Sequence, residues 1–322
     1  MPMPEDAATV ETAGTLVKTL RGAFGTPQSH RPAHATGRLT TGTFIPSSEA
    51  ASLSSAPHFK NASTPLIVRF SSSTGIVNIP DTDANANPRG IGIRFDLGNN
   101  GHKHTDIIAH STAFFPMRTG EGFLAMLGAI GGGTIGKFLE ENPTAAAFVN
   151  DPKPSPVSFA TEKYFSVNAF KLISKDGKIT FVRYRIVPEA GFSTLSDEHL
   201  ASKSKTYLYD ELFERVSKGP IEFKLLVQIA EEGDVTDDST KHWPEERKLV
   251  ELGTIKVDKV KSEEESKKEQ KHIIYDPVPR VEGVESSADP LIDMRAAIYL
   301  ISGKVRRAAQ EEAPVVAPAE LA

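Results

Sequence analysis

The sequence predicts an α+β fold in which a closed eight-stranded antiparallel β-barrel is surrounded by helices. Strand-like segments are numerous, and helices interrupt them instead of alternating with each one, which argues against a doubly wound parallel sheet. Eight strands are enough to close a small barrel. The predicted strands are Gly37–Ile45, Pro65–Ser71, Gly90–Leu97, Thr105–Ser111, Tyr164–Ile173, Lys178–Val187, Pro220–Ile229 and Lys248–Val257.

The clearest strand is residues 221–229, IEFKLLVQI. Apolar side chains take its odd positions, while its charged and amide side chains take even positions, which is the period of two that a half-buried strand requires. Turn residues lie at 99–101, Asn-Asn-Gly, and at 176–177, Asp-Gly. Because each turn joins two adjacent strand segments, we expect antiparallel hairpins there.

Helical patterns cover residues 9–24, 120–130, 136–149 and 209–219, and a last helix begins with Asp289 as N-cap and Pro290 at its first position. The chain then divides into five parts by composition. These are an N-terminal helix (1–24), the barrel core with inserted helices (25–257), a mixed-charge linker or surface helix (258–272), a connecting segment with the last helix (273–309) and a tail predicted to be disordered (310–322).

Composition excludes several classes of function. The 322-residue chain has a net charge of -5 and no basic block outside mixed-sign runs, so neither nucleic acid nor an anionic membrane is an expected partner. It has no cysteine, which excludes disulfides, iron-sulfur clusters, nucleophilic thiols and thiolate ligands. No run approaches ~20 apolar residues, and the N-terminus lacks a signal-peptide pattern. We therefore expect a cytoplasmic protein that acts on small molecules.

The last helix carries a polar face that packing does not require. Arg295, Tyr299 and Arg306 fall within about 40° of one another around the helix axis. A guanidinium one turn before a phenol favours the phenolate, which is a hard anionic ligand for ferric iron. The alternative is a surface Arg/Tyr pair without a ligand. A separate face of the helix is apolar and consists of Leu291, Met294, Ile298, Ile301 and Val305.

Two other motifs are weaker. GGGTIGK at 131–137 matches a phosphate-binding loop in spacing, but Phe138 stands where Ser or Thr would hold magnesium, and a helix instead of a strand precedes it. The pairs His30/His34 and His102/His104 have spacings that zinc could use. Pro32 interrupts the first pair and a turn adjoins the second, so we favour structural roles for both.

Four segments, read together with RAAIY at 295–299, resemble the haem catalase family, and most closely its short catalase-related peroxidases. The resemblance runs from about Gly25 to Arg306. The segments are RPAHATG with His34, PLIVRFSSSTG with Arg69 and Ser71, NPRGIGIRF, and DIIAHSTAFF with His110. The resemblance implies that haem b lies between the barrel and the last helix.

The resemblance also implies roles for single residues. His34 matches the distal acid-base histidine, Ser71 matches the serine that hydrogen-bonds it, and Tyr299 matches the iron ligand. The family usually has asparagine at the position of His110, so we expect peroxide binding to be pH-sensitive between about pH 5 and 8 if His110 faces the pocket. If the His110 ring points away from the pocket, we expect a neighbour such as Ser111 to supply the contact with peroxide. The residues that match haem contacts are Arg31, Arg69, Phe114 or Phe115, Arg295, Tyr299 and Arg306.

By this resemblance the protein is a haem peroxidase or catalase that cleaves hydrogen peroxide or organic hydroperoxides through an oxyferryl intermediate. Short length and His110 favour a small organic electron donor over dismutation. Gly303, where many full-length catalases have histidine, implies altered hydrogen bonding beside the iron ligand. The alternatives are a fatty-acid hydroperoxide-rearranging enzyme of the allene oxide synthase type and a non-enzymatic haem protein. A homodimer is one oligomeric state that the sequence allows.

Overall fold

The computed structural model describes residues 2–310. Within them, eight strands close into an antiparallel barrel, in which β7 pairs with both β5 and β8. The predicted fold class is therefore confirmed. The barrel strands, in the order in which they pair, are β1 (Gly37–Pro46), β2 (Thr64–Ser72), β3 (Arg89–Asp96), β4 (His104–His110), β5 (Tyr164–Phe165), β7 (Ile179–Pro188), β8 (Ile221–Ile229) and β9 (Leu249–Val260).

The predicted strand Tyr164–Ile173 is wrong as a single element. Residues 166–169 leave the ladder and divide it into β5 and β6 (Phe170–Ile173), both of which pair with β7. These four residues face only two residues of β7, because Phe165 pairs with Arg185 and Phe170 with Val182. A short strand, β10 (Val284–Ser286), pairs with β6 and was not predicted, since three residues are too few to show a period.

The barrel interior is filled by aromatic and branched side chains, among which Phe70, Phe95, Phe159 and Phe223 are almost fully buried. The alternation of side chains along β2 explains which residues remain available for a site. Phe70 belongs to this core, so its neighbours Arg69 and Ser71 lie on the opposite, outer face of the strand.

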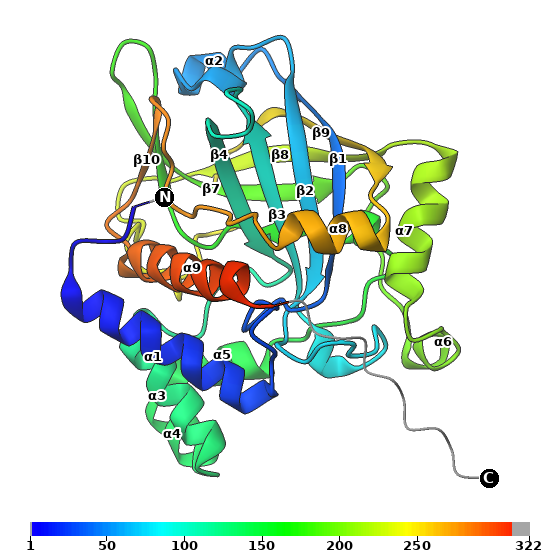
Figure 1. Cartoon of the computed structure of the whole chain (residues 1–322). Helices are drawn as coiled ribbons and strands as arrows, with labels where there is room; N and C mark the ends of the chain where they lie inside the picture. The colour runs from blue at the N-terminus through cyan, green and yellow to red at the C-terminus, as the bar shows by residue number, and fades with distance from the viewer. Residues whose placement is uncertain (1, 311–322) are drawn as a thin grey trace.

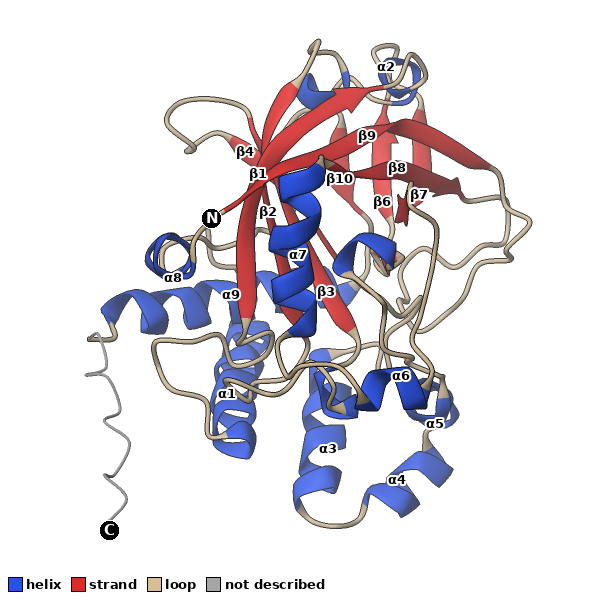
Figure 2. Ribbon diagram, turned by 90° about the vertical axis from the view of Figure 1, so that its right-hand side faces the viewer, coloured by secondary structure: helices blue, strands red, loops and turns tan. Residues whose placement is uncertain are grey.

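Helices cover this outer face and one end of the barrel (Figures 1 and 2). Helix α1 packs on α9 and on α3, and α8 packs on β1. The helices are α1 (Ala7–Phe24), α2 (Ala50–Leu53), α3 (Gly120–Gly131), α4 (Ile135–Glu141), α5 (Pro143–Asn150), α6 (Asp197–Ala201), α7 (Tyr207–Lys218), α8 (Glu263–Gln270) and α9 (Pro290–Ala308).

The predicted helix 136–149 is two helices, because Pro143 cannot continue α4 and instead begins α5. The predicted start of α9 is confirmed: Asp289 is its N-cap and accepts a hydrogen bond from the backbone N–H of Leu291 at 2.9 Å. The predicted disorder of the tail concerns residues that, apart from Gln310, lie outside the described part of the chain. None of the helices within residues 2–310 is both long and apolar enough to cross a membrane.

Candidate active site

A cavity of about 350 Å³ lies between the outer face of β2 to β4 and helix α9. Its lining includes nine of the ten predicted site residues, which come from segments separated by up to 275 positions in the sequence. The nine are Arg31, His34, Arg69, Ser71, His110, Phe115, Arg295, Tyr299 and Arg306.

His34 is held by both its backbone and its ring. Its φ of 54° places it in the left-handed region, and its backbone N–H donates to Ser73 O at 2.9 Å. Its carbonyl accepts from Arg69 at 2.9 Å, and its Nδ1 lies 3.0 Å from Ser71 Oγ. No described residue forms a hydrogen bond with its other ring nitrogen, Nε2. Burial, together with the positive charge of Arg69, lowers the pKa of His34 to about 3.

Gly90 makes room for the His34 ring. A Cβ atom at this position of β3 would lie 2.7 Å from His34 Cε1 and Nδ1 and 2.9 Å from Ser71 Oγ. The imidazole therefore packs directly on the backbone of β3, and only glycine permits this contact.

His110, at the end of β4, also lines the cavity. Ser111 does not replace it, since Ser111 Oγ accepts a hydrogen bond from the backbone N–H of Arg89. Burial, with Arg295 nearby, lowers the pKa of His110 to about 3. The expectation that His110 titrates between about pH 5 and 8 is therefore wrong, because the sequence does not reveal how far the ring is desolvated.

On the opposite side of the cavity, α9 presents Arg295 and Tyr299. Arg295 Nε donates to Tyr299 Oη at 3.1 Å, and Arg295 Nη1 donates to Asn168 Oδ1. Asn168 Nδ2 in turn donates to Asp289 Oδ2 at 2.8 Å. The amide thus links the N-cap of α9 to the arginine. Within residues 2–310, Arg295 forms no direct ion pair with a carboxylate, although its charge acts on Asp289 across this amide.

Three arginines gather at one end of the cavity. Arg31, Arg69 and Arg306 form no ion pair with any acidic side chain among residues 2–310. They donate instead to neutral groups: Arg31 and Arg306 both donate to Ile273 O, and Arg69 Nε donates to Gln270 Oε1 at 2.9 Å. Burial and mutual repulsion lower the pKa of Arg31 well below its ordinary value. Such a cluster is suited to an anionic ligand.

The two candidate phenylalanines, Phe114 and Phe115, lie in different surroundings. Phe115 lines the cavity, whereas Phe114 does not. Phe114 is buried with its ring centroid 4.3 Å from that of His242 and 5.6 Å from that of Phe148. The prediction that either could serve is thus narrowed to Phe115, since of the two rings only this one lines the cavity.

The packing of Ile274 explains why position 303 of α9 is a glycine. A Cβ atom at Gly303 would lie 2.2 Å from Ile274 Cδ1, so the 273–275 segment fills the space beside this turn of α9. The same segment places Tyr275 at the cavity, where its ring lies 3.3 Å from the position that a Cβ of Gly92 would take. A hydrogen-bonding side chain at position 303 would require the Ile274 side chain to move.

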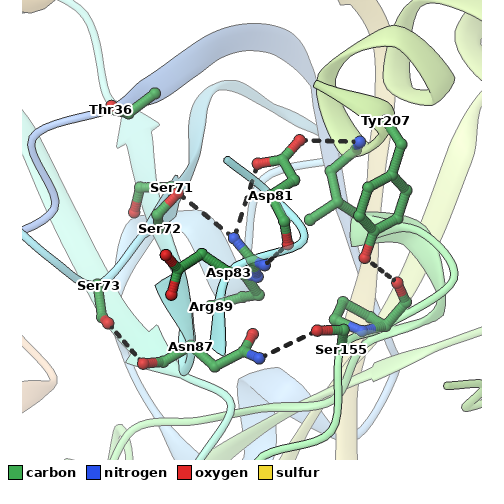
Figure 3. Close-up of polar contacts among 12 residues, drawn as sticks. Thr36, Ser71, Ser72, Ser73, Asp81, Asp83, Asn87, Arg89, Ser155 and Tyr207 are labelled. Carbon is green, nitrogen blue, oxygen red and sulfur yellow. Dashed lines mark hydrogen bonds and ion pairs between the residues drawn. The ribbon is translucent and has the colours of Figure 1, made fainter. Parts of the chain in front are cut away.

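A second polar layer lies behind the ends of β2 and β3 (Figure 3). Arg89 is fully buried. Its Nη2 donates to Asp81 O at 2.6 Å, and its Nη1 donates to Ser72 Oγ at 3.4 Å. Asp81 Oδ2 accepts from the backbone N–H of Leu208 at 3.0 Å, and burial raises the pKa of Asp81 to about 6. This layer fixes the strand ends that carry Ser71 and Gly90.

Sequence reasoning missed the supporting residues of the site. Asn168 lay in a segment interpreted as a strand, and Gln270 lay in a mixed-charge run interpreted as solvated. No periodic signal distinguishes such residues, since their roles depend on contacts between distant segments. The missed residues are Thr112, Asn168, Gln270 and Tyr275, whereas Asp289 was predicted, but only as the N-cap of α9.

The fold of this chain is the core fold of the catalases. A fungal catalase structure matches 90% of this chain with a TM-score of 0.75 at 21% identity, and catalase A from Saccharomyces cerevisiae matches 91% with a TM-score of 0.75 at 20% identity. The chain spans 62% and 64% of those two structures, respectively.

The chain belongs to the catalase family. The family model Catalase matches residues 137–320. A catalase-related peroxidase from Synechococcus elongatus is 32% identical over 308 residues, covering 92% of this chain and 89% of the relative. Another catalase-related peroxidase, from Mycolicibacterium paratuberculosis, is 31% identical over 303 residues, covering 92% and 95%. Catalase family proteins bind haem and act on peroxide.

Proposed function

We propose that this protein is a haem-dependent peroxidase or catalase that cleaves hydrogen peroxide or an organic hydroperoxide and prefers an organic electron donor to dismutation. One observation carries the proposal. A single cavity joins an arginine-supported phenol, two neutral imidazoles and a cluster of three arginines without carboxylate partners. The membership of the catalase family supports the same function.

The residues present fit a haem. Tyr299 would supply the phenolate ligand to iron, supported by Arg295, whose Nε donates to the phenol oxygen. Arg31, Arg69 and Arg306 would hold the two carboxylates of the porphyrin, which resolves their lack of acidic partners. Apolar side chains such as Phe115 and Ile298 complete the walls. Without cysteine the chain cannot form thioether bonds to a haem, so we infer a non-covalent haem b.

When bound, haem would supply the redox centre that accepts the oxidising equivalents of the peroxide. The protein supplies proton transfer. His34 is neutral at physiological pH, so its free Nε2 is positioned to take a proton from one peroxide oxygen and return it to the other, while Ser71 holds Nδ1. His110 occupies more volume than an amide would and leaves less room for a second peroxide, which favours reduction by an organic donor.

Two measurements on purified protein test the proposal. Haem-loaded protein should show a Soret band and a tyrosinate-ligated ferric spectrum, and Tyr299→Phe should weaken haem retention or shift that spectrum. Tyr209→Phe is the matched control, since Tyr209 is a buried phenol that does not line the cavity. An unchanged spectrum in Tyr299→Phe would contradict the ligand assignment.

The balance of activities is tested separately. We expect dye oxidation to exceed oxygen release with hydrogen peroxide, and His110→Asn to raise oxygen release relative to dye oxidation. An unchanged ratio would contradict the role of His110. Product analysis with a fatty-acid hydroperoxide distinguishes the rearranging enzyme. Loss of peroxide turnover without loss of haem in His34→Ala is the result that excludes a non-enzymatic haem protein.

A further inference from the structure

Thr112 meets the His110 ring with two different atoms. Its backbone nitrogen lies 3.4 Å from His110 Nδ1, and its hydroxyl oxygen lies 2.6 Å from the same atom. Thr112 is 2% exposed. Its hydroxyl forms no other hydrogen bond within residues 2–310. The ring nitrogen is therefore engaged by a single buried residue two positions further along the chain.

This geometry selects one tautomer of His110. A backbone N–H can only donate, so Nδ1 has to be the acceptor. If Nδ1 carried the proton, two N–H groups would face each other, and the Thr112 hydroxyl hydrogen would have no acceptor in a buried position, which is costly. With the proton on Nε2, Nδ1 accepts both contacts and every group is satisfied.

The Nε2–H group of His110 is left for a ligand, because the ring lines the cavity and none of the described residues forms a hydrogen bond with this nitrogen. The charged or titratable groups that act on His110 are Arg295 and His34. Arg295 disfavours a second proton on the ring, and burial acts in the same direction by lowering its pKa to about 3. His110 is thus a donor whose form does not change at physiological pH.

His34 differs in this respect. Its Nδ1 faces Ser71 Oγ, a hydroxyl that can either donate or accept, and that also lies 3.5 Å from Gly90 O. Ser71 can therefore follow a change of tautomer at His34, whereas Thr112 opposes one at His110. Proton transfer suits the first imidazole and fixed donation suits the second.

We propose that Thr112 is a positioning residue that locks His110 as an Nε2–H donor to an oxygen atom or small anion bound in the cavity. The identity of that ligand as peroxide on haem rests on the proposed function. The tautomer does not, since it follows from the contacts within the chain alone.

The tautomer is measured by nitrogen NMR on the full-length protein labelled at histidine, with His110→Asn to assign the signal. We expect a neutral ring protonated at Nε2 throughout pH 5 to 8. A ring protonated at Nδ1, or a midpoint of titration within that range, would overturn the proposal. This result is independent of haem loading, so a failure of the proposed function would be seen separately as the absence of the haem spectrum.

The role of Thr112 is measured by fluoride binding to the haem-loaded protein, since fluoride accepts hydrogen bonds from groups in the cavity. Thr112→Val should weaken fluoride binding by about fivefold, the size expected for losing one neutral hydrogen bond that orients the donor, and Thr112→Ser should restore it. Thr40→Val is the control, because Thr40 is fully buried and donates to Val68 O away from the cavity. Equal fluoride affinity in Thr112→Val and the wild type would overturn the assignment.

Discussion

At the scale of single residues, the site depends on two imidazoles that burial keeps neutral. The isolated side chain of histidine titrates near pH 6.5, yet burial lowers the pKa of both His34 and His110 to about 3. Both sit near cations, Arg69 for the first and Arg295 for the second. Burial therefore keeps the two rings in their unprotonated form, and the neighbouring cations act in the same direction.

The pKa of His34 predicts the pH profile of the reaction with peroxide. A lowered pKa means that the neutral, proton-accepting ring persists as pH falls and is lost only when pH approaches 3. We expect the second-order rate constant to be flat from pH 8 to about pH 5. Stopped-flow measurement across this range checks it, and an acid limb with a midpoint near 6.5 that disappears in His34→Ala would contradict it.

Gly90 provides a second prediction at this scale. Gly90→Ala would place a methyl group 2.7 Å from the His34 ring, so the ring must move. We expect the rate of peroxide cleavage to fall by about 10²-fold while haem is retained, since misplacement of a reacting group by about 1 Å has effects of this size. Gly128→Ala is the control, because no atom lies within 4 Å of its Cβ position. Equal rates of peroxide cleavage in the two variants would show that the packing of His34 on Gly90 does not determine this rate.

At the scale of elements, the break between β5 and β6 has a functional consequence. Residues 166–169 leave the β7 ladder, and this departure carries Asn168 to the start of α9, where it meets Asp289 and Arg295. A continuous strand would have kept its residues in the sheet. The irregularity that the sequence pattern concealed is therefore the feature that supports the helix carrying Arg295 and Tyr299.

Asn168→Asp tests this support. The variant would place a carboxylate directly on Arg295 and beside Asp289, so the guanidinium charge would be neutralised at the expense of the Tyr299 phenolate. We expect haem affinity to fall by about tenfold or more, the scale of a lost charge-assisted hydrogen bond. Haem transfer to an acceptor protein measures it. Asn142→Asp is the control, since that amide donates to Phe138 O on another helix, and equal transfer rates would contradict the link.

At the scale of the whole molecule, the cavity is lined by parts of the chain that lie far apart in the sequence. The barrel contributes Arg69, the segment before β1 contributes Arg31, and α9 contributes Arg306. A bound haem would stabilise all of them together, since a ligand that binds only the folded state raises its stability by mass action.

This predicts different thermal effects for two ligands. Haem at about 100 times its dissociation constant should raise the melting temperature by roughly 5 °C or more, whereas haem dimethyl ester, which has no carboxylates, should raise it less. Arg69→Gln should remove most of that difference, and Arg118→Gln, at an exposed position, should not. Differential scanning calorimetry checks both, and equal shifts for the two ligands would contradict carboxylate binding by the arginine cluster.

The sequence by itself determined the eight-stranded barrel, the capped last helix and the residue types of the site. Alternation along residues 221–229 (β8) and the spacing of Arg295, Tyr299 and Arg306 are local, so a periodic pattern records them. The resemblance to a family then indicated that the segments carrying His34, Ser71 and His110 form one site with the last helix, which no local pattern shows. The oxyferryl intermediate and the preference for an organic donor stay predictions.

Only the tertiary structure decided how these residues act. Desolvation of His34 and His110, the choice of Phe115 over Phe114, and the contacts of Thr112 and Asn168 depend on which distant segments surround each side chain. Ile274 excludes a side chain at position 303 for the same reason. Solvent exclusion and packing are properties of the folded surroundings, whereas periodicity is a property of the chain, and this is why the sequence predicted the elements but not the environment of the site.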